Sequence, residues 1–270
     1  MSGHSATSVD PAAETTWDPG ELRLVTTGGW RRGLLPLLRK ELGQWWGTRQ
    51  WVIQALTALA VINGIVALVM ASDPSEDPVI VFAQAGMITS ALAVIVTAQG
   101  AVVGEKQRGT AAWVLSKPVS RPSFLLAKLV SYGIGFGTLW LLLPWAVFNL
   151  ESRLILGKAP AALPLLEAMG LWGLHLLVYL SLVLALGTFF SSRGPVAAIG
   201  IGVVLAGQFL GDLLPISVTT LSPWLLPDLA NAVAHGQDVP VSIMTAVVAN
   251  LVLVLAVTTA ALWRFSREEL

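Results

Sequence analysis

Apolar residues are gathered into six long runs that short polar segments separate. A helix that crosses a bilayer needs roughly 20 consecutive apolar residues to span a hydrocarbon core about 30 Å thick. We expect spanning helices over about 50–71, 79–103, 129–150, 164–190, 195–214 and 241–263. The pattern therefore predicts an all-α membrane protein with six transmembrane helices.

Composition supports this prediction, because 55% of the 270 residues are hydrophobic and only 12% are charged. Soluble globular proteins carry about 25% charged residues, so half of the usual polar surface is missing here. We therefore expect a lipid environment. The formal net charge is zero and gives no sign of a nucleic-acid partner, so we expect none. The chain has no cysteine, which excludes disulfides and thiolate metal sites.

The distribution of Lys and Arg predicts the orientation of the chain. If the N-terminus is inside, all but two of the 16 Lys and Arg residues fall in inner segments, and the exceptions are Arg153 and Lys158. Short cytoplasmic loops carry such an excess of positive residues. We therefore expect a multi-pass protein of the cell's inner (cytoplasmic) membrane with both termini in the cytoplasm.

Two different segments precede the first apolar run. Residues 1–27 are polar, small and interrupted by Pro and Gly, and we expect a flexible cytoplasmic lead. Over 28–49, apolar residues recur at helical spacing, at Leu34, Leu38, Leu42 and Trp45. This favours an amphipathic elbow helix in the membrane interface, anchored by Trp45 and Trp46. The alternative is a plain cytoplasmic extension of the first spanning helix.

The segment 215–240, between the fifth and sixth runs, is too interrupted by proline to span the membrane. It is nevertheless too apolar, in SPWLLPDLANAV, for a free loop. We expect a re-entrant or interfacial helix on the outer side.

The loop over 104–128 begins with GEKQRGT, which resembles the start of a phosphate-binding loop. Such a loop follows a β-strand and needs a lysine that reaches the phosphates. Here the stretch follows a predicted membrane span, and Thr110 occupies the position of that lysine. The pattern therefore excludes a nucleotide site on this chain.

The same loop contains AAWVLSK, which is apolar enough to form a short helix that Pro118 ends. Ser120 is then placed to cap the next helix, with Pro122 tolerated in its first turn. A short helix that carries Trp113 between two turns is typical of a docking element. The alternative is an interfacial loop whose Trp113 rests on lipid headgroups.

Polar side chains inside spans are costly to bury in lipid and are candidates for function. We take six as possible translocation-path residues, Asn63, Gln84, Gln99, His175, Tyr179 and Gln208. His175 and Tyr179 lie four residues apart on one helix face, and a hydrogen bond from the histidine to a neighbouring helix is favoured over a proton relay.

Motifs of membrane enzymes are absent from the sequence. There is no H-E-x-x-H, no G-x-S-x-G, and the three histidines are scattered. We therefore expect no enzyme activity and no catalytic, cofactor or metal site on this chain.

The loop and the elbow helix together resemble a known family. The matching positions of the loop are Glu105, Gly109-Thr110, Leu115-Ser116, Pro118-Val119-Ser120-Arg121, Phe124-Leu125 and Lys128. They are similar to the segment after the second span in ABC-2-type permeases, a family that includes copper-processing, sodium-export and drug-export permeases. Lys40-Glu41-Leu42 is similar to the family's elbow helix, whereas Ser123 departs from its acidic or amide cap residue.

The resemblance implies the permease subunit of an ABC exporter, in which two separate ATPase chains bind ATP and Mg²⁺. It also implies a second permease copy or a homologous permease, and a coupling helix in the loop 104–128. The residues expected to contact the ATPase are Glu105, Lys106, Arg108, Gly109, Thr110, Trp113, Leu115, Ser116 and Arg121. The alternatives are a force-transmitting component that transports nothing, and an ion-coupled transporter that works without an ATPase.

Overall fold

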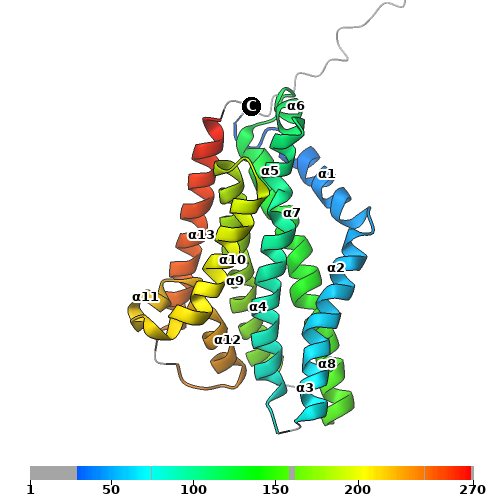
Figure 1. The fold of residues 1–270 in the computed structure, drawn as a ribbon, viewed down its shortest axis with the longest axis vertical. Coiled ribbons are helices and arrows are strands. Elements are labelled where there is room, and N and C mark those ends of the chain that lie inside the picture. Colours follow the sequence, from blue (N-terminus) through cyan, green and yellow to red (C-terminus); the bar gives the residue numbers. More distant parts are fainter. Residues whose placement is uncertain (1–28, 74, 158–161, 240, 269–270) are drawn as a thin grey trace, which may run out of the picture.

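The computed structural model describes residues 29–73, 75–157, 162–239 and 241–268. Every element in this part of the chain is a helix, and the helices lie side by side in an elongated bundle (Figure 1). The lead predicted over 1–27 lies outside the described residues.

Six helices are long and apolar enough to cross a membrane. They are Gln50–Ser72, Pro78–Gln107, Arg121–Ile155, Leu163–Phe189, Arg193–Leu210 and Ile243–Ser266. The prediction of an all-α chain with six candidate spans is therefore confirmed.

Several of these spans consist of consecutive helical pieces. The pieces are α2 (Gln50–Ala58), η2 (Leu59–Asn63) and α3 (Gly64–Ser72), then α4 (Pro78–Ala98) and α5 (Gly100–Gln107), then α7 (Arg121–Phe136), η3 (Gly137–Leu142) and α8 (Leu143–Leu156). The remaining spans are single helices, α9 (Ala162–Phe189), α10 (Arg193–Leu210) and α13 (Ile243–Ser266). The π turns of η3 precede Pro144, whose missing backbone N–H interrupts the regular hydrogen-bond ladder.

Helix α9 forms the centre of the bundle. Of its most apolar stretch of 18 residues, 72% is buried inside the subunit, whereas the corresponding share is 17% for α10 and for α13. Close packing on α4 depends on Gly86, where a Cβ atom would lie 1.9 Å from the ring of Trp172. The indole Nε1 of Trp172 donates to Ser90 Oγ at 2.9 Å. The peripheral helices α10 and α13 leave wide apolar faces for lipid or for another chain.

Four short helices connect α10 to α13, and they are η4 (Gly211–Leu213), α11 (Ile216–Thr220), η5 (Pro223–Leu225) and α12 (Leu226–Ala234). Helix α12 packs back onto α9 and α4 through Leu226, Leu229 and Ala230. The segment 215–240, expected to form a re-entrant or interfacial helix, contains α11, η5 and α12, and its place in a membrane stays a prediction.

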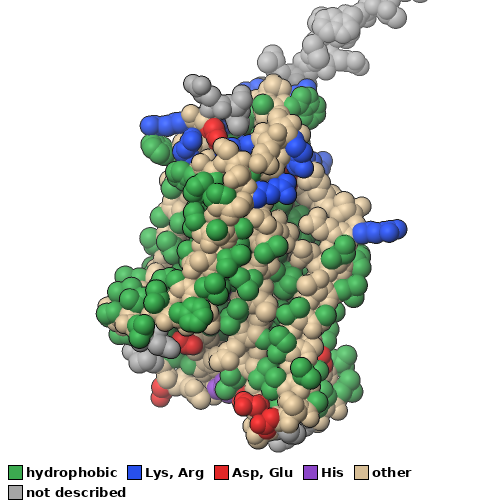
Figure 2. Space-filling view, viewed as in Figure 1, with side chains coloured by type: hydrophobic (Ala, Val, Ile, Leu, Met, Phe, Trp, Pro, Cys, Tyr) green, Lys and Arg blue, Asp and Glu red, His purple; other side chains and the backbone are tan. Residues whose placement is uncertain are grey.

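Charge is separated along the bundle (Figure 2). Lys and Arg side chains gather at one end, over α1 (Leu34–Trp46), α6 (Thr110–Leu115) and the last turn of α13. We call this the basic end. Acidic side chains gather at the opposite end, below α3 and α4. This separation agrees with the sequence pattern used to predict the orientation.

Helix boundaries around the predicted loop 104–128 differ from expectation. The second span continues to Gln107 rather than to about 103, and the third begins at Arg121 rather than at about 129. Ser120 caps α7 by accepting from the Ser123 amide at 3.1 Å, with Pro122 in the first turn, as the sequence predicted. The third span starts early because Lys128 is neutralised inside the bundle, as described below.

The elbow segment also departs from one expectation. Helix α1 forms over Leu34–Trp46 and ends at Gly47. Trp45, expected in the membrane interface, is only 5% exposed and packs between α1 and α7. A tryptophan ring at the end of an apolar run fits a protein interior as well as a lipid interface, and here a glycine on α7 provides the space.

Candidate functional site

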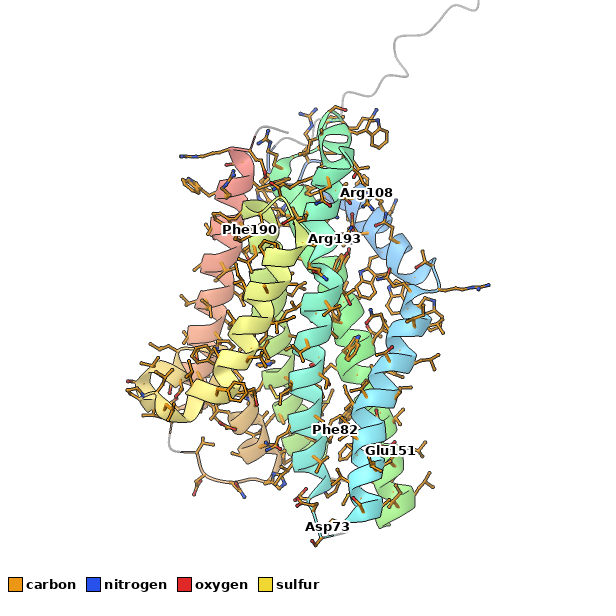
Figure 3. All side chains as sticks on the ribbon, in the orientation of Figure 1. Asp73, Phe82, Arg108, Glu151, Phe190 and Arg193 are labelled. Atoms are coloured by element: carbon orange, nitrogen blue, oxygen red, sulfur yellow. The ribbon has the colours of Figure 1, made fainter. Side chains whose placement is uncertain are left out.

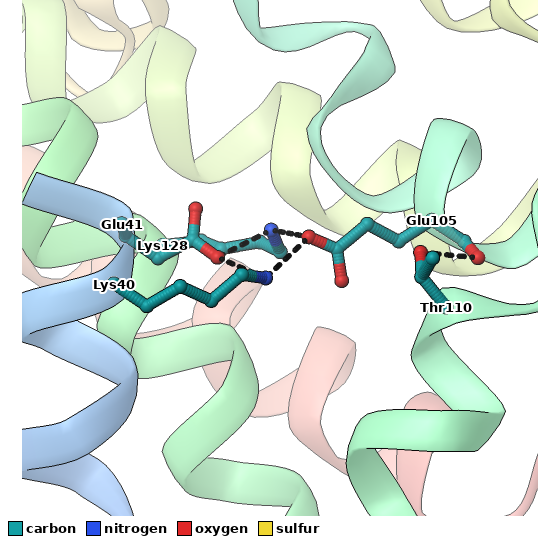
Figure 4. A network of polar contacts seen from close by, with 5 residues as sticks. All are labelled: Lys40, Glu41, Glu105, Thr110 and Lys128. Atoms are coloured by element: carbon teal, nitrogen blue, oxygen red, sulfur yellow. Dashed lines mark hydrogen bonds and ion pairs between the residues drawn. The ribbon is translucent and has the colours of Figure 1, made fainter. Parts of the chain in front are cut away.

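Four charged side chains from three helices meet inside the basic end (Figure 4). Lys128 Nζ of α7 lies 3.1 Å from Glu41 Oε1 of α1 and 2.8 Å from Glu105 Oε1 of α5. Lys40 Nζ of α1 lies 3.3 Å and 3.2 Å from the same two oxygens. We call Lys40, Glu41, Glu105 and Lys128 the ion cluster. It joins α1 to the second and third spans.

Three members of the ion cluster are almost fully buried, with exposed fractions of 2% for Lys128, 3% for Glu41 and 5% for Glu105. Buried charges are costly unless each has a close partner of opposite sign, which the alternation of two lysines and two carboxylates provides. Partial burial lowers the pKa of Lys40, but the carboxylates of Glu105 and Glu41 outweigh that effect and raise it overall. The ion cluster therefore connects α1, α5 and α7 through charged contacts that are largely buried.

Aromatic packing holds α1 against α7 beside the ion cluster. The indole of Trp45 lies over Gly135, where a Cβ atom would come within 2.8 Å of the ring. It meets Tyr132 edge-on at 5.2 Å and Phe136 at 5.3 Å between ring centroids. Helix α1 and the start of the third span therefore form one packed unit.

Helix α6 stands at the tip of the basic end (Figure 1). It begins after Gly109, whose φ of +69° is readily adopted by glycine. The hydroxyl of Thr110 donates to the backbone oxygen of Glu105 at 3.2 Å, which ties α6 to α5. Val114 of α6 packs inward, whereas Trp113 is 66% exposed with the Lys117 ammonium 5.0 Å from its ring centre.

The turn that follows α6 is attached to the N-terminal segment. The hydroxyl of Ser123 donates to the Trp30 carbonyl at 2.6 Å, and the Ser120 amide donates to the Arg32 carbonyl at 2.9 Å. The base of α6 is therefore held by a part of the chain that lies far away in sequence.

Arg121, the first residue of α7 after this turn, is attached to the C-terminal segment. Arg121 Nη1 donates to the backbone oxygens of Phe265, Ser266 and Glu268 at 3.0, 2.8 and 2.7 Å. A guanidinium at the C-terminus of α13 satisfies carbonyls that the helix leaves open. A displacement of the turn would thus move the sixth span.

Lys106 makes an equivalent contact with the central helix. Its Nζ donates to the Phe190 carbonyl at 3.2 Å and to the Thr188 carbonyl at 3.3 Å, at the C-terminus of α9. The same ammonium pairs with Glu268 at 2.7 Å. Lys106 therefore links α5, α9 and the end of α13.

The nine predicted ATPase-contact residues fall into two groups. Those on the open surface are Arg108, Gly109, Trp113 and Ser116, and those buried or partly buried are Glu105, Lys106, Thr110, Leu115 and Arg121. Of the second group, Glu105, Lys106, Thr110 and Arg121 make polar contacts that link helices within the subunit, and Leu115 is partly buried. The contact of either group with an ATPase stays a prediction.

The six predicted path residues do not form a single site. Asn63 is buried and donates to the Pro144 carbonyl at 3.1 Å, and His175 Nδ1 lies 3.2 Å from the Pro223 carbonyl oxygen. Gln99 is partly exposed and donates to a carbonyl of its own helix. The side chain of Tyr179 is buried and meets the His175 ring edge-on, with 4.9 Å between ring centroids.

Gln84 and Gln208 are brought together by the fold. Both are exposed, and both line a pocket of about 480 Å³ between α4, α10 and the short helices that follow α10. Thr219 and Trp224 complete part of the lining. Among the described residues no group of three or more His, Asp or Glu side chains could hold a metal ion.

Comparison with known proteins shows the family of this chain. A model of ABC-2 family transporter proteins matches residues 35–270. The chain belongs to the ABC-2 transporter family. The family that the sequence resembled is thereby confirmed, whereas the roles expected for the loop and the elbow segment stay predictions.

Two relatives of this ABC-2 protein extend the comparison. It is 23% identical over 205 residues to YxlG of Bacillus subtilis strain 168, described as an uncharacterised transmembrane protein, with 73% of this chain and 75% of that one aligned. It is 29% identical over 152 residues to NosY of Pseudomonas aeruginosa, described as a probable ABC transporter permease protein. That alignment covers 50% of this chain and 53% of NosY.

Three members of the ion cluster, Lys40, Glu41 and Lys128, were not predicted as site residues of this ABC-2 protein. A signal was present, because Lys128 interrupts the apolar run FLLAKLV and needs an acidic partner if that run is helical. Sequence spacing does not reveal which acid supplies it, since Glu41 lies on a separate helix.

Proposed function

We propose that this ABC-2 protein is the permease subunit of an ATP-driven exporter. Two separate ATPase chains bind ATP and Mg²⁺ and contact the basic end, which faces the cytoplasm. A second permease copy or a homologous permease completes the membrane part. The chain itself has no catalytic role.

The observation that supports the proposal most directly is the construction of α6. Its outer face exposes Trp113, a residue type that often dominates binding energy at interfaces. Its base is attached to four of the spanning helices by Glu105, Lys106 and Arg121. A push on α6 by a moving ATPase would therefore reach the second, third, fourth and sixth spans together.

A transport role is favoured over force transmission alone by the pocket that contains Gln84 and Gln208. It is lined in part by Gly207 and Gln208 of α10, and the subunit buries only 17% of this apolar helix, which leaves a face of it open. A second copy packed against this face would enclose a polar path between the subunits. Export is favoured because the links between the first and second spans and between the third and fourth spans are short and offer little surface for a solute-binding protein.

The test compares two exposed tryptophans of the basic end. Trp113 on α6 and Trp263 on α13 are 66% and 55% exposed, so either can be replaced by alanine without opening the core. The tagged full chain is purified from its own membranes, co-purifying chains are identified by mass spectrometry, and ATP hydrolysis is measured.

We expect an ABC ATPase to co-purify with the wild type. Trp113→Ala should lower its retention and the coupled hydrolysis by about tenfold or more, as for a central interface tryptophan. Trp263→Ala should match the wild type. The proposal fails if no ATPase co-purifies, or if both variants retain it equally.

A further inference from the structure

Two arginines lie side by side where the second span ends and the fifth begins (Figure 3). Arg108 follows α5, and Arg193 is the first residue of α10. Both guanidinium groups lie close to Gly104. A Cβ atom added to Gly104 would lie 3.0 Å from Arg193 Nη2 and 3.7 Å from Arg108 Nη2. Both side chains belong to exposed residues.

Glycines provide the space in which the Arg193 side chain lies. A Cβ atom at Gly100 would come within 3.1 Å of Arg193 Cζ, so the guanidinium rests directly on the helix backbone over Gly100 and Gly104. The turn before Arg193 is fixed to α5, because Gln107 Nε2 donates to the Ser191 carbonyl at 2.8 Å. The position of the guanidinium is therefore built into the packing of the two spans.

The paired positive charges are not neutralised within the described chain. Neither guanidinium forms a hydrogen bond or an ion pair with another described residue. The described carboxylates of this end are engaged elsewhere, Glu41 and Glu105 in the ion cluster and Glu268 with Lys106. The N-cap Ser192 makes no side-chain hydrogen bond to α10, so the positive helix terminus adds to the same potential.

This arrangement has the chemistry of a phosphate site. Guanidinium groups donate in pairs to phosphate oxygens with a geometry that an ammonium lacks. The two arginines also lie at the ends of apolar spans, the level at which headgroup phosphates of a bilayer are found, and basic pockets between spans bind anionic headgroups.

We propose that Arg108 and Arg193 form a binding site for one phosphate group, carried by a membrane phospholipid or by a soluble phosphate compound. The site extends beyond the proposed export function, because it requires no ATPase. Its test on the full permease chain alone is therefore independent of the test of coupling.

The experiment measures phospholipid binding to the delipidated full chain in detergent by native mass spectrometry. Phosphatidylglycerol and a diacylglycerol with the same acyl chains are titrated in parallel, and sn-glycerol 3-phosphate is added as a soluble competitor. The variants are Arg193→Gln, Arg108→Gln and Gly104→Val. The matched controls are Arg267→Gln, an exposed arginine of the same end, and Gly202→Ala, where no atom lies within 4 Å of the added Cβ. Thermal melts establish that each variant is folded.

We expect one tightly held phosphatidylglycerol per chain and weaker binding of diacylglycerol. Each arginine variant should weaken phosphatidylglycerol binding by about tenfold. Gly104→Val should weaken it as well, because it displaces the Arg193 guanidinium while leaving the net charge unchanged. Stabilisation of the wild type by glycerol phosphate, lost in Arg193→Gln, would assign the site to a soluble phosphate compound.

Three results would overturn the proposal. The first is a loss in Arg267→Gln equal to that in Arg193→Gln, which would show a diffuse charge effect. The second is unchanged binding in a folded Gly104→Val variant. The third is absence of saturable binding of both phosphatidylglycerol and glycerol phosphate to the wild type.

Discussion

Replacement of Lys128 by methionine tests whether the ion cluster holds the basic end together. Lys128 is 2% exposed and is the closest cation to both buried carboxylates. Without it, Glu41 and Glu105 would face each other with only Lys40 between them, and the Lys40 side chain is 38% exposed. Removing one partner of a buried ion pair costs about 3–5 kcal/mol. For a chain of this size, such a loss lowers Tm by about 10 °C.

A double variant separates loss of charge balance from simple loss of packing, because it should restore stability relative to Lys128→Met. In Lys128→Met with Glu105→Gln, one buried charge of each sign is gone and Lys40 still pairs with Glu41. The double variant should therefore be more stable than Lys128→Met alone, although it carries one more substitution. Lys117→Met, an exposed lysine of the same end, should change Tm by no more than about 2 °C.

The assay is a thermal melt of purified protein in one detergent, followed by size-exclusion chromatography. The reasoning is refuted if Lys128→Met melts with the wild type. It is also refuted if the Glu105→Gln substitution lowers the stability of Lys128→Met further, since the cluster would then not act as a charge-balanced unit.

Two further predictions concern packing and pH. Gly86→Ala would place a Cβ atom 1.9 Å from the indole of Trp172 and should lower the free energy of unfolding by about 1–3 kcal/mol. Gly202→Ala, where no atom lies within 4 Å of the added Cβ, should leave Tm unchanged or raise it. Thermal melts of both variants test this. The Asn231 carbonyl and the Asp77 carboxylate raise the pKa of His235 in the folded protein. The protonated imidazole therefore contributes its full stabilisation below about pH 6.5, the pKa of an unfolded histidine, and this stabilisation is lost as pH rises through the raised pKa of the folded state. Tm of the wild type should fall between about pH 6 and about pH 9 more than that of His235→Gln, and equal slopes would contradict this.

The sequence was sufficient to predict features that depend on local composition. Each spanning run differs so strongly in hydropathy from its flanks that all six candidate spans could be placed without contact information. The cap by Ser120 was predictable because it is formed within one helical turn, with Ser123. The short helix α6 was predictable because glycine and proline bound an apolar stretch.

Features that depend on contacts between distant helices were not predictable. Lys128 pairs with residues 87 and 23 positions away, so hydropathy alone assigned it to a loop and placed the start of the third span too late. Trp45 packs on a glycine of another helix, a contact that no spacing within α1 indicates. For the same reason Arg193 was counted only as a topological signal, although it lies against two glycines of the second span.

The chain contains no cysteine, so one introduced thiol reports on a single position. Ser116 lies exposed at the end of α6 and is close in size to cysteine. The most direct test of the account is labelling of Ser116→Cys by a membrane-impermeant maleimide, in vesicles of each orientation, with and without the co-purifying ATPase. The account predicts labelling from the cytoplasmic side alone and protection when the ATPase is bound. Labelling from the outer side, or equal labelling with the ATPase present, would contradict it.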